Sequence, residues 1–187
     1  MNKAHVYLLP LQEDDREQFI RDNQWAFKYG STIEFGMRND QFEEGDEIIS
    51  RRTIEYSIDH GEAYRIWYQG EKAGGVVIHT EKERGDLDLL FTLPEFHSKG
   101  IGVAAWFAIE KMHPEVSVWE TLTPYFDTRN IHFYVNKCGF HIVEFFNPYH
   151  PEPDCPGDVP WYDNDDMNED PSGGTGLDFR FEKVIRK

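Results

Sequence analysis

The sequence predicts an α+β fold, in which one mostly antiparallel sheet of about seven strands is flanked by about four helices. Three observations support this prediction. Short β-branched and aromatic runs alternate with polar or glycine-containing turns, other segments carry apolar residues every three or four positions, and helical segments interrupt the strand segments along the chain. The 187 residues are enough for one sizeable core, so we expect a single domain over residues 1–187.

The first half of the chain predicts a strand, two helices and three more strands. The apolar run HVYLLPL at residues 5–11 indicates the first strand. The segment at residues 13–30 is acidic at its start and basic later, which suits the dipole of a helix. A second helix is expected at residues 47–61, where Gly61 is a typical stop. The next strands, whose short polar turns are typical of an antiparallel meander, are expected at residues 62–70, 72–80 and 86–93.

The second half predicts two helices and three strands. A helix at residues 102–113 ends before Pro114, and a helix at residues 127–140 ends at Gly139, where a left-handed cap belongs. The predicted buried faces are Ile101, Ala105, Ala108 and Met112 in the first helix, and Ile131, Tyr134, Val135 and Cys138 in the second. The strands are expected at residues 116–122, 140–146 and 176–185. The two strands on either side of the first of these helices should pair in parallel.

A long acidic insert separates the last two strands, at about residues 148–176. Between Pro148 and Thr175 it carries eight carboxylates, no Lys or Arg, and several prolines. A loop of this length is either a functional lid or a solvated, disordered segment, and both alternatives stay open.

Charge and cysteine content limit the classes of partner. The formal net charge of -16 argues against nucleic acid and anionic membranes, because both need clustered Lys and Arg. It suits a cationic substrate, although solubility alone also explains it. Two cysteines, no apolar run of membrane-spanning length and no signal-peptide pattern lead us to expect a cytoplasmic protein. The His and Cys spacings match no metal site, so we expect no metal.

The stretch EFHSKGIGVAAW at residues 95–106 predicts a turn that leads into a helix. The first backbone N–H groups of a helix have no partner within it, and glycines let an anion approach them closely. The stretch lacks the Gly-Lys-Ser/Thr ending of a P-loop and the third glycine of a dinucleotide-binding turn. Its own residues therefore indicate an anion site, with an ordinary turn as the alternative.

A second motif strengthens the anion site. The segments LLFTLPEFHSKGIG and RNIHFYVNKCGF together resemble the GNAT superfamily of N-acetyltransferases, and the order of predicted elements matches that family across nearly the whole chain. In the family's first motif, a Pro-Glu turn precedes Arg or Gln, two residues, Gly, one residue, and Gly or Ala. Here that run extends from His97 to Gly102, with His97 in the Arg or Gln position. The second motif is matched by Asn130, Tyr134, Gly139 and Phe140.

The resemblance implies that acetyl-CoA is the co-substrate. The strand before the turn would pair with the pantetheine through Phe91, Thr92 and Leu93, next to a bulge that separates this strand from its neighbour. The turn residues that would hold the pyrophosphate are His97, Ser98, Lys99, Gly100, Ile101, Gly102, Val103 and Ala104. Asn130 would either contact the cofactor or satisfy the first turn of its helix. Since a neutral imidazole has one donor, His97 is expected to weaken the grip on the pyrophosphate as pH rises.

The resemblance also implies direct transfer without a covalent enzyme intermediate. Tyr134 matches the family's general acid, which would protonate the leaving thiolate, and core packing alone is its alternative. The base that deprotonates the amine is expected to be Glu120 or an ordered water, with Glu55 and Glu34 as weaker candidates. Backbone N–H groups of the bulged strand would stabilise the oxyanion. Cys138 lies on a predicted buried face and is not expected to act as a nucleophile.

The sequence thus predicts an acetyl-CoA-dependent N-acetyltransferase that acts on an amine of a small molecule or peptide. Aromatic and acidic walls, expected from residues 25–40 and from the insert, suit a cationic acceptor. A non-catalytic acyl-CoA-binding or sensory module is one alternative, and a phosphate-binding protein without a link to CoA is another. The C-terminal strands offer an edge along which a homodimer could form.

Overall fold

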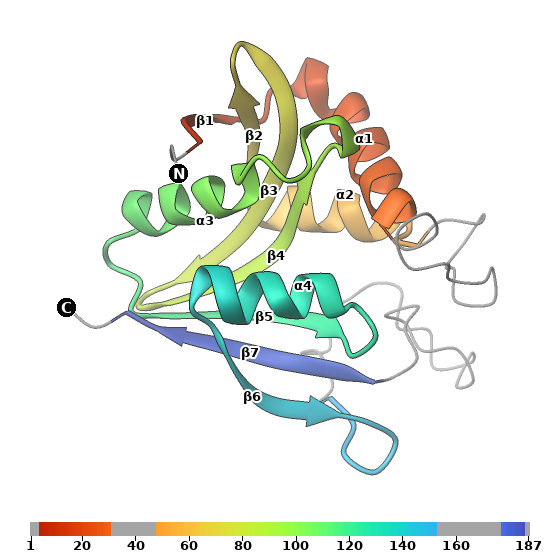
Figure 1. The fold of residues 1–187 in the computed structure, drawn as a ribbon, viewed down its shortest axis with the longest axis vertical. Coiled ribbons are helices and arrows are strands. Elements are labelled where there is room, and N and C mark those ends of the chain that lie inside the picture. Colours follow the sequence, from red (N-terminus) through yellow and green to blue (C-terminus); the bar gives the residue numbers. More distant parts are fainter. Residues whose placement is uncertain (1–3, 31–47, 153–176, 186–187) are drawn as a thin grey trace.

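One seven-stranded sheet forms the centre of the described part of the chain. The computed structural model describes residues 4–30, 48–152 and 177–185. Within them the strands lie in the order β1-β2-β3-β4-β5-β7-β6, and all neighbours are antiparallel except β4 and β5 (Figure 1). The strands are β1 (Val6–Pro10), β2 (Glu62–Tyr68), β3 (Glu71–Glu81), β4 (Arg84–Thr92), β5 (Val118–Pro124), β6 (His141–Phe146) and β7 (Asp178–Val184). The predicted mixed, mostly antiparallel sheet is confirmed.

Helices cover both faces of this sheet. Helices α1 (Arg16–Lys28) and α2 (Arg51–His60) lie on one face, and α3 (Ile101–Met112) and α4 (Thr128–His132) lie on the other (Figure 1). Helix α4 continues directly into a π-helix, η6 (Phe133–Cys138). Short 3-10 helices, η1 (Glu13–Asp15) and η5 (Pro94–Phe96), precede α1 and α3. The predicted order of strands and helices is therefore the observed order.

Each face of the sheet has its own apolar core. On the α3 side, the rings of Trp106 and Trp119 meet edge to face, with 5.2 Å between their centroids. On the α1 side, Phe19 meets Phe91 of β4 in the same way, also at 5.2 Å. Since large aromatic side chains supply much of the free energy of burial, these two pairs hold the helix layers against the sheet.

The buried face of α3 differs from its predicted face. The buried residues of α3 are Ile101, Ala105, Trp106 and Ile109. Ala108 is only half-buried and Met112 is 44% exposed, so the prediction was wrong at these positions. The helix is apolar on most sides, and its large indole ring takes the place nearest the sheet. On the π-helix, Tyr134 and Cys138 are buried as predicted, whereas Val135 is 37% exposed.

Strands β4 and β5 are paired only at their beginnings. Their parallel register joins Arg84, Gly85 and Asp86 to Val118, Trp119 and Glu120. Next along β4, the pairing with β3 skips Asp88, which forms a bulge. The register ends there, although β4 continues to Thr92 and β5 continues to Pro124. The expected parallel pair and the expected bulge are both confirmed, and together they create a split between two neighbouring strands.

None of the helices in the described ranges is long and apolar enough to cross a membrane. The acidic insert predicted at 148–176 lies outside the described residues from position 153 onwards, as do Glu34 and most of the loop at 25–40. The expectation of a single domain stays a prediction.

Candidate active site

The turn between β4 and α3 presents free backbone N–H groups. Ser98 and Gly100 have left-handed backbones, with φ of 61° and 74°, and α3 begins directly afterwards. The N–H of Ala104 makes the first helical hydrogen bond, to the Gly100 carbonyl at 3.0 Å. The N–H groups of Ile101 and Gly102 therefore have no partner inside the helix, and neither does that of Val103. Such a helix start, with the positive end of its dipole, is suited to phosphate oxygens.

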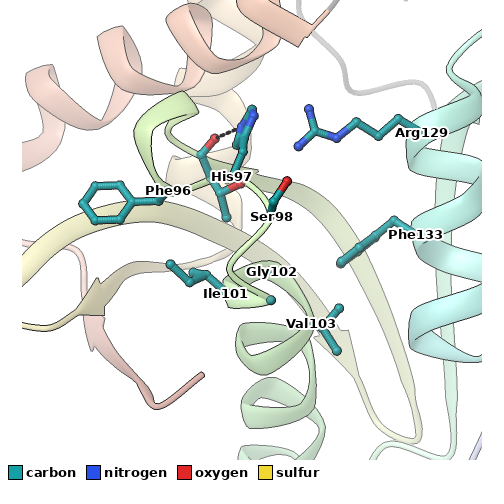
Figure 2. Close-up of a pocket in the computed structure, with 10 residues that line it drawn as sticks. Phe96, His97, Ser98, Ile101, Gly102, Val103, Arg129 and Phe133 are labelled. Atoms are coloured by element: carbon teal, nitrogen blue, oxygen red, sulfur yellow. Dashed lines mark hydrogen bonds between the residues drawn. The ribbon is translucent and has the colours of Figure 1, made fainter. Parts of the chain in front are cut away.

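A hollow of about 130 Å³ lies at this helix start (Figure 2). Its lining residues are Thr92, Phe96, His97, Ser98, Gly100, Ile101, Gly102, Val103, Arg129 and Phe133. Seven of them were predicted as cofactor contacts from the sequence. Phe96, Arg129 and Phe133 were missed, because their part in the site depends on how the turn and α4 face each other across the hollow.

The two glycines of the turn meet different requirements. A Cβ at Gly100 would have open space around it, so this glycine is needed for its left-handed backbone. A Cβ at Gly102 would lie 3.3 Å from the ring of Phe133. Glycine at this position therefore keeps the start of α3 close to the π-helix, and a larger residue would push the two walls of the hollow apart.

The remaining predicted contacts surround the hollow without lining it. The side chain of Phe91 belongs to the core under α1, and Leu93 packs against the opposite core. The N–H of Leu93 donates to the Ala73 carbonyl of β3 at 2.9 Å, so it is already engaged. The N–H of Ala104 is likewise used within α3.

At the start of the second motif, the residue that caps the helix is Asp127 and not Asn130. Asp127 is the N-cap of α4, and its carboxylate accepts a hydrogen bond from the Asn130 N–H at 2.9 Å. Asn130 lies in the first turn and does not cap the helix itself. Its side chain does not line the hollow, and its cofactor contact stays a prediction.

The two basic side chains of the turn point back onto the turn itself. His97 Nε2 lies 3.0 Å from the Thr92 carbonyl (Figure 2). The imidazole ring packs edge-on against Tyr29, with 5.7 Å between the ring centroids. Lys99 donates to the Glu95 carbonyl at 2.9 Å, and its ammonium lies 4.8 Å from the ring centroid of Phe96. Both side chains therefore support the conformation of the turn.

Tyr134 lies beside the split, on its β5 side. Its hydroxyl is within hydrogen-bonding reach of Thr121 and Thr123, and its ring packs against Phe140 and Phe181. Burial raises the pKa of Tyr134 above its ordinary value. The residue therefore belongs to the core while its hydroxyl faces polar groups of β5. That position suits either the predicted acid or a packing role.

Cys138 is buried, as predicted. Burial raises the pKa of its thiol to about 12, so little thiolate forms near neutral pH. This agrees with the expectation that Cys138 is not a nucleophile.

Glu120 lies at the root of the split, which is the point where the pairing of β4 with β5 ends. Its carboxylate belongs to a network of ion pairs. Its carboxylate contacts Arg84, and it lies 3.4 Å from Arg180. Arg180 also lies 2.9 Å from Glu144 and 3.1 Å from Glu182. The two guanidinium groups would compete with a substrate ammonium for Glu120, and its role as the base stays a prediction.

A second carboxylate at the same place was missed by sequence reasoning. Asp86 is the register partner of Glu120 across the two parallel strands. Asp86 is an exposed residue, but desolvation of its carboxyl group by the surrounding protein raises its pKa to about 7, and repulsion from Asp88 adds to it. Glu55, which was a weaker sequence candidate for the base, is paired with Arg51 at 2.7 Å on the surface of α2.

Comparison with protein families and curated proteins agrees with this geometry. The family model described as the acetyltransferase (GNAT) family matches residues 19–140. An uncharacterised protein of Bacillus subtilis (strain 168), YrkN, is 38% identical over 195 residues, which cover 100% of this chain and 97% of the relative.

Solved acetyltransferases share the fold at low sequence identity. The PaiA N-acetyltransferase from Thermoplasma acidophilum, in complex with coenzyme A, aligns with a TM-score of 0.63 at 16% identity, over 97% of this chain and 99% of that one. The ribosomal-protein-S18-alanine N-acetyltransferase from Escherichia coli aligns with a TM-score of 0.62 at 13% identity, over 98% and 96%. With the family model and the full-length relative, the fold leads to one conclusion: the chain belongs to the GNAT acetyltransferase family.

Proposed function

We propose that this protein is an N-acetyltransferase that takes an acetyl group from acetyl-CoA and passes it to an amine by direct attack. The observation that carries the proposal is the position of the anion-binding turn. The free N–H groups at the start of α3 lie at the end of β4, next to the split between β4 and β5. An anion at the turn and an extended chain in the split are what a pyrophosphate joined to a pantetheine requires.

The residues of the turn fit the co-substrate. Ile101, Gly102 and Val103 offer backbone donors to the pyrophosphate, and Gly102 leaves room for it beside Phe133. The edge of β4 that faces β5 is free of strand pairing beyond Asp86, so it is open to pairing with the pantetheine amides. Bound in this way, acetyl-CoA supplies an activated acetyl group, and the protein supplies position and charge.

Two side-chain roles complete the proposal. Tyr134 donates the proton to the leaving thiolate, since its hydroxyl lies beside Thr121 and Thr123 at the split. The amine is deprotonated by a carboxylate at the root of the split, either Glu120 or its register partner Asp86, or by a water between them. The high negative charge of the chain favours a cationic acceptor. We further propose that the protein is cytoplasmic. Both a monomer and a homodimer are compatible with this proposal.

Two measurements test the proposed function. Calorimetry with CoA measures binding, and release of free thiol from acetyl-CoA measures transfer to a panel of amino acids, polyamines, aminoglycosides and other amines. We expect CoA to bind and at least one amine to release thiol well above the rate without an acceptor. CoA binding without turnover for any amine would favour a non-catalytic CoA-binding module. No CoA binding at millimolar concentration would contradict the proposed function altogether.

A further inference from the structure

The two basic side chains of the turn are engaged within the turn. In the position where the family has Arg or Gln, this chain has His97, and its Nε2 is directed at the Thr92 carbonyl. Lys99 is held by the Glu95 carbonyl and the ring of Phe96, and it does not line the hollow. The turn therefore offers backbone N–H groups to an anion, while the ammonium group of Lys99 is directed at the Glu95 carbonyl.

A cation reaches the hollow from the opposite wall. Among the described residues that line the hollow, Arg129 is the only Lys or Arg, and it comes from the first turn of α4. Figure 2 shows its guanidinium group directed across the hollow, toward the side where Ser98 and His97 lie. An anion bound at the start of α3 would lie between the helix N–H groups on one side and this guanidinium group on the other.

The charge of the molecule makes such a cation important. With a formal net charge of -16, the protein repels an anionic ligand at long range, so local positive groups must offset that repulsion. A guanidinium group is the side chain best suited to this task, because its planar fork bonds two phosphate oxygens at once and stays charged at all working pH values.

We propose that Arg129 is the cationic side-chain contact to the pyrophosphate of CoA in this protein, in place of the residue at position 97. The inference rests on the proposed function, since it names a contact at that same site. The inference also goes beyond the proposed function, because it assigns the cationic contact with the cofactor to the first turn of α4 instead of the β4–α3 turn.

The test compares three variants by calorimetry with two ligands, CoA and dephospho-CoA, which lacks the 3′-phosphate and keeps the pyrophosphate. Arg129→Gln keeps hydrogen-bond donors and removes the charge. We expect its dissociation constants for both ligands to rise by the same factor, about tenfold or more. Arg129→Lys keeps the charge and loses the fork, so its affinities should lie between those of the wild type and the Gln variant. Lys137→Gln is the matched control, since it removes one positive charge from an exposed position on the adjoining π-helix.

The outcomes separate this inference from the proposed function. If the wild type binds CoA and Arg129→Gln binds it equally well, the inference is wrong and the proposed function stands. If Arg129→Gln weakens CoA but not dephospho-CoA, the contact is to the 3′-phosphate and the inference is again wrong. If the wild type binds neither ligand, both proposals fail. Thermal melting establishes that each variant is folded. A Lys variant that binds no better than the Gln variant would contradict a role for the charge.

Discussion

The Thr121 hydroxyl of β5 donates a hydrogen bond to the Leu87 carbonyl of β4, at 2.8 Å. This bond follows directly after the last main-chain pair of the two strands, Asp86 with Glu120. It replaces a main-chain bond at the point where the strands separate, and it satisfies a buried carbonyl beside the bulge at Asp88. The split that would receive the pantetheine is therefore closed at its root by a side chain.

Replacing Thr121 with Val tests this closure. Val has the same shape but no hydroxyl, so the Leu87 carbonyl would lose a buried partner. We expect the free energy of unfolding to fall by about 1–3 kcal/mol, measured by urea denaturation. Thr80→Val, at an exposed position of β3, is the control and should change stability by less than about 0.5 kcal/mol. If both substitutions lower the free energy of unfolding by the same amount, the hydrogen bond between Thr121 and Leu87 does not stabilise the fold more than an exposed contact.

Replacing Tyr134 with Phe separates its acid role from its packing role. The ring contacts with Phe140 and Phe181 remain, and only the hydroxyl that faces Thr121 and Thr123 is lost. If Tyr134 is the acid, kcat with a good acceptor should fall about 100-fold while the affinity for CoA stays the same. Tyr149→Phe, at a 99% exposed position, is the control. An unchanged kcat would leave Tyr134 with packing alone.

The two carboxylates at the root of the split are expected to differ in their effect on the pH profile. Desolvation raises the pKa of Asp86 to about 7, so a base at this position would make the rate rise through neutral pH. Asp86→Asn should remove that rise and lower kcat about 100-fold, measured with an acceptor whose own pKa lies well outside this range. Glu120→Gln, which disrupts ion pairs with Arg84 and Arg180, provides the comparison. If only Glu120→Gln removes the rise, Glu120 is the base.

Arg65 anchors α1 to the sheet through a buried network of charges. It is 2% exposed and contacts Asp15 at 2.7 Å and Asp22 at 2.8 Å. Without Arg65, Asp15 would keep Lys72 at 2.8 Å, whereas Asp22 would lose its ion pair and stay largely buried. Arg65→Met should therefore lower the free energy of unfolding by about 3–5 kcal/mol. Arg21→Met, on the exposed side of α1, should cost less than about 0.5 kcal/mol in the same urea titration. A small effect at Arg65 would mean that apolar contacts replace the charge.

His79 should make stability depend on pH. Its Nδ1 lies 3.0 Å from the His60 carbonyl and its Nε2 lies 3.2 Å from Asp88, so both ring nitrogens face oxygen acceptors. The hydrogen bond with Asp88, together with the charge of that carboxylate, raises the pKa of His79 above its ordinary value. The stabilisation is therefore present in full below the ordinary pKa of about 6.5 and is lost as pH rises through the raised folded value.

His79→Gln is expected to lower the melting temperature at pH 5.5 and to have a much smaller effect at pH 9, where the wild-type imidazole is neutral. His132→Gln, at an exposed position of α4, is the control at both pH values. A loss of the same size at both pH values would contradict the charged state of His79 and point to packing alone.

Local features of the chain were predictable because near neighbours decide them. The left-handed cap at Gly139, and the end of α3 before Pro114, follow from backbone preferences of those residues. The buried face of α3 was not predictable in detail. The apolar residues of α3 are spaced so that several faces of the helix could be buried. The contacts of Trp106 with Trp119 and Phe140 decide which face packs against the sheet.

The sequence by itself determined the order of strands and helices, the glycine-containing turn before α3 and the family, because hydrophobic period, turn residues and motifs are all written along the chain. Only the tertiary structure decided where the charges lie. His97 Nε2 faces the Thr92 carbonyl, Glu120 contacts Arg84 and lies near Arg180, and Arg129 lines the hollow from another helix. The physical reason is that side-chain contacts between distant segments depend on how helices pack on the sheet, and the motif residues alone do not specify that packing.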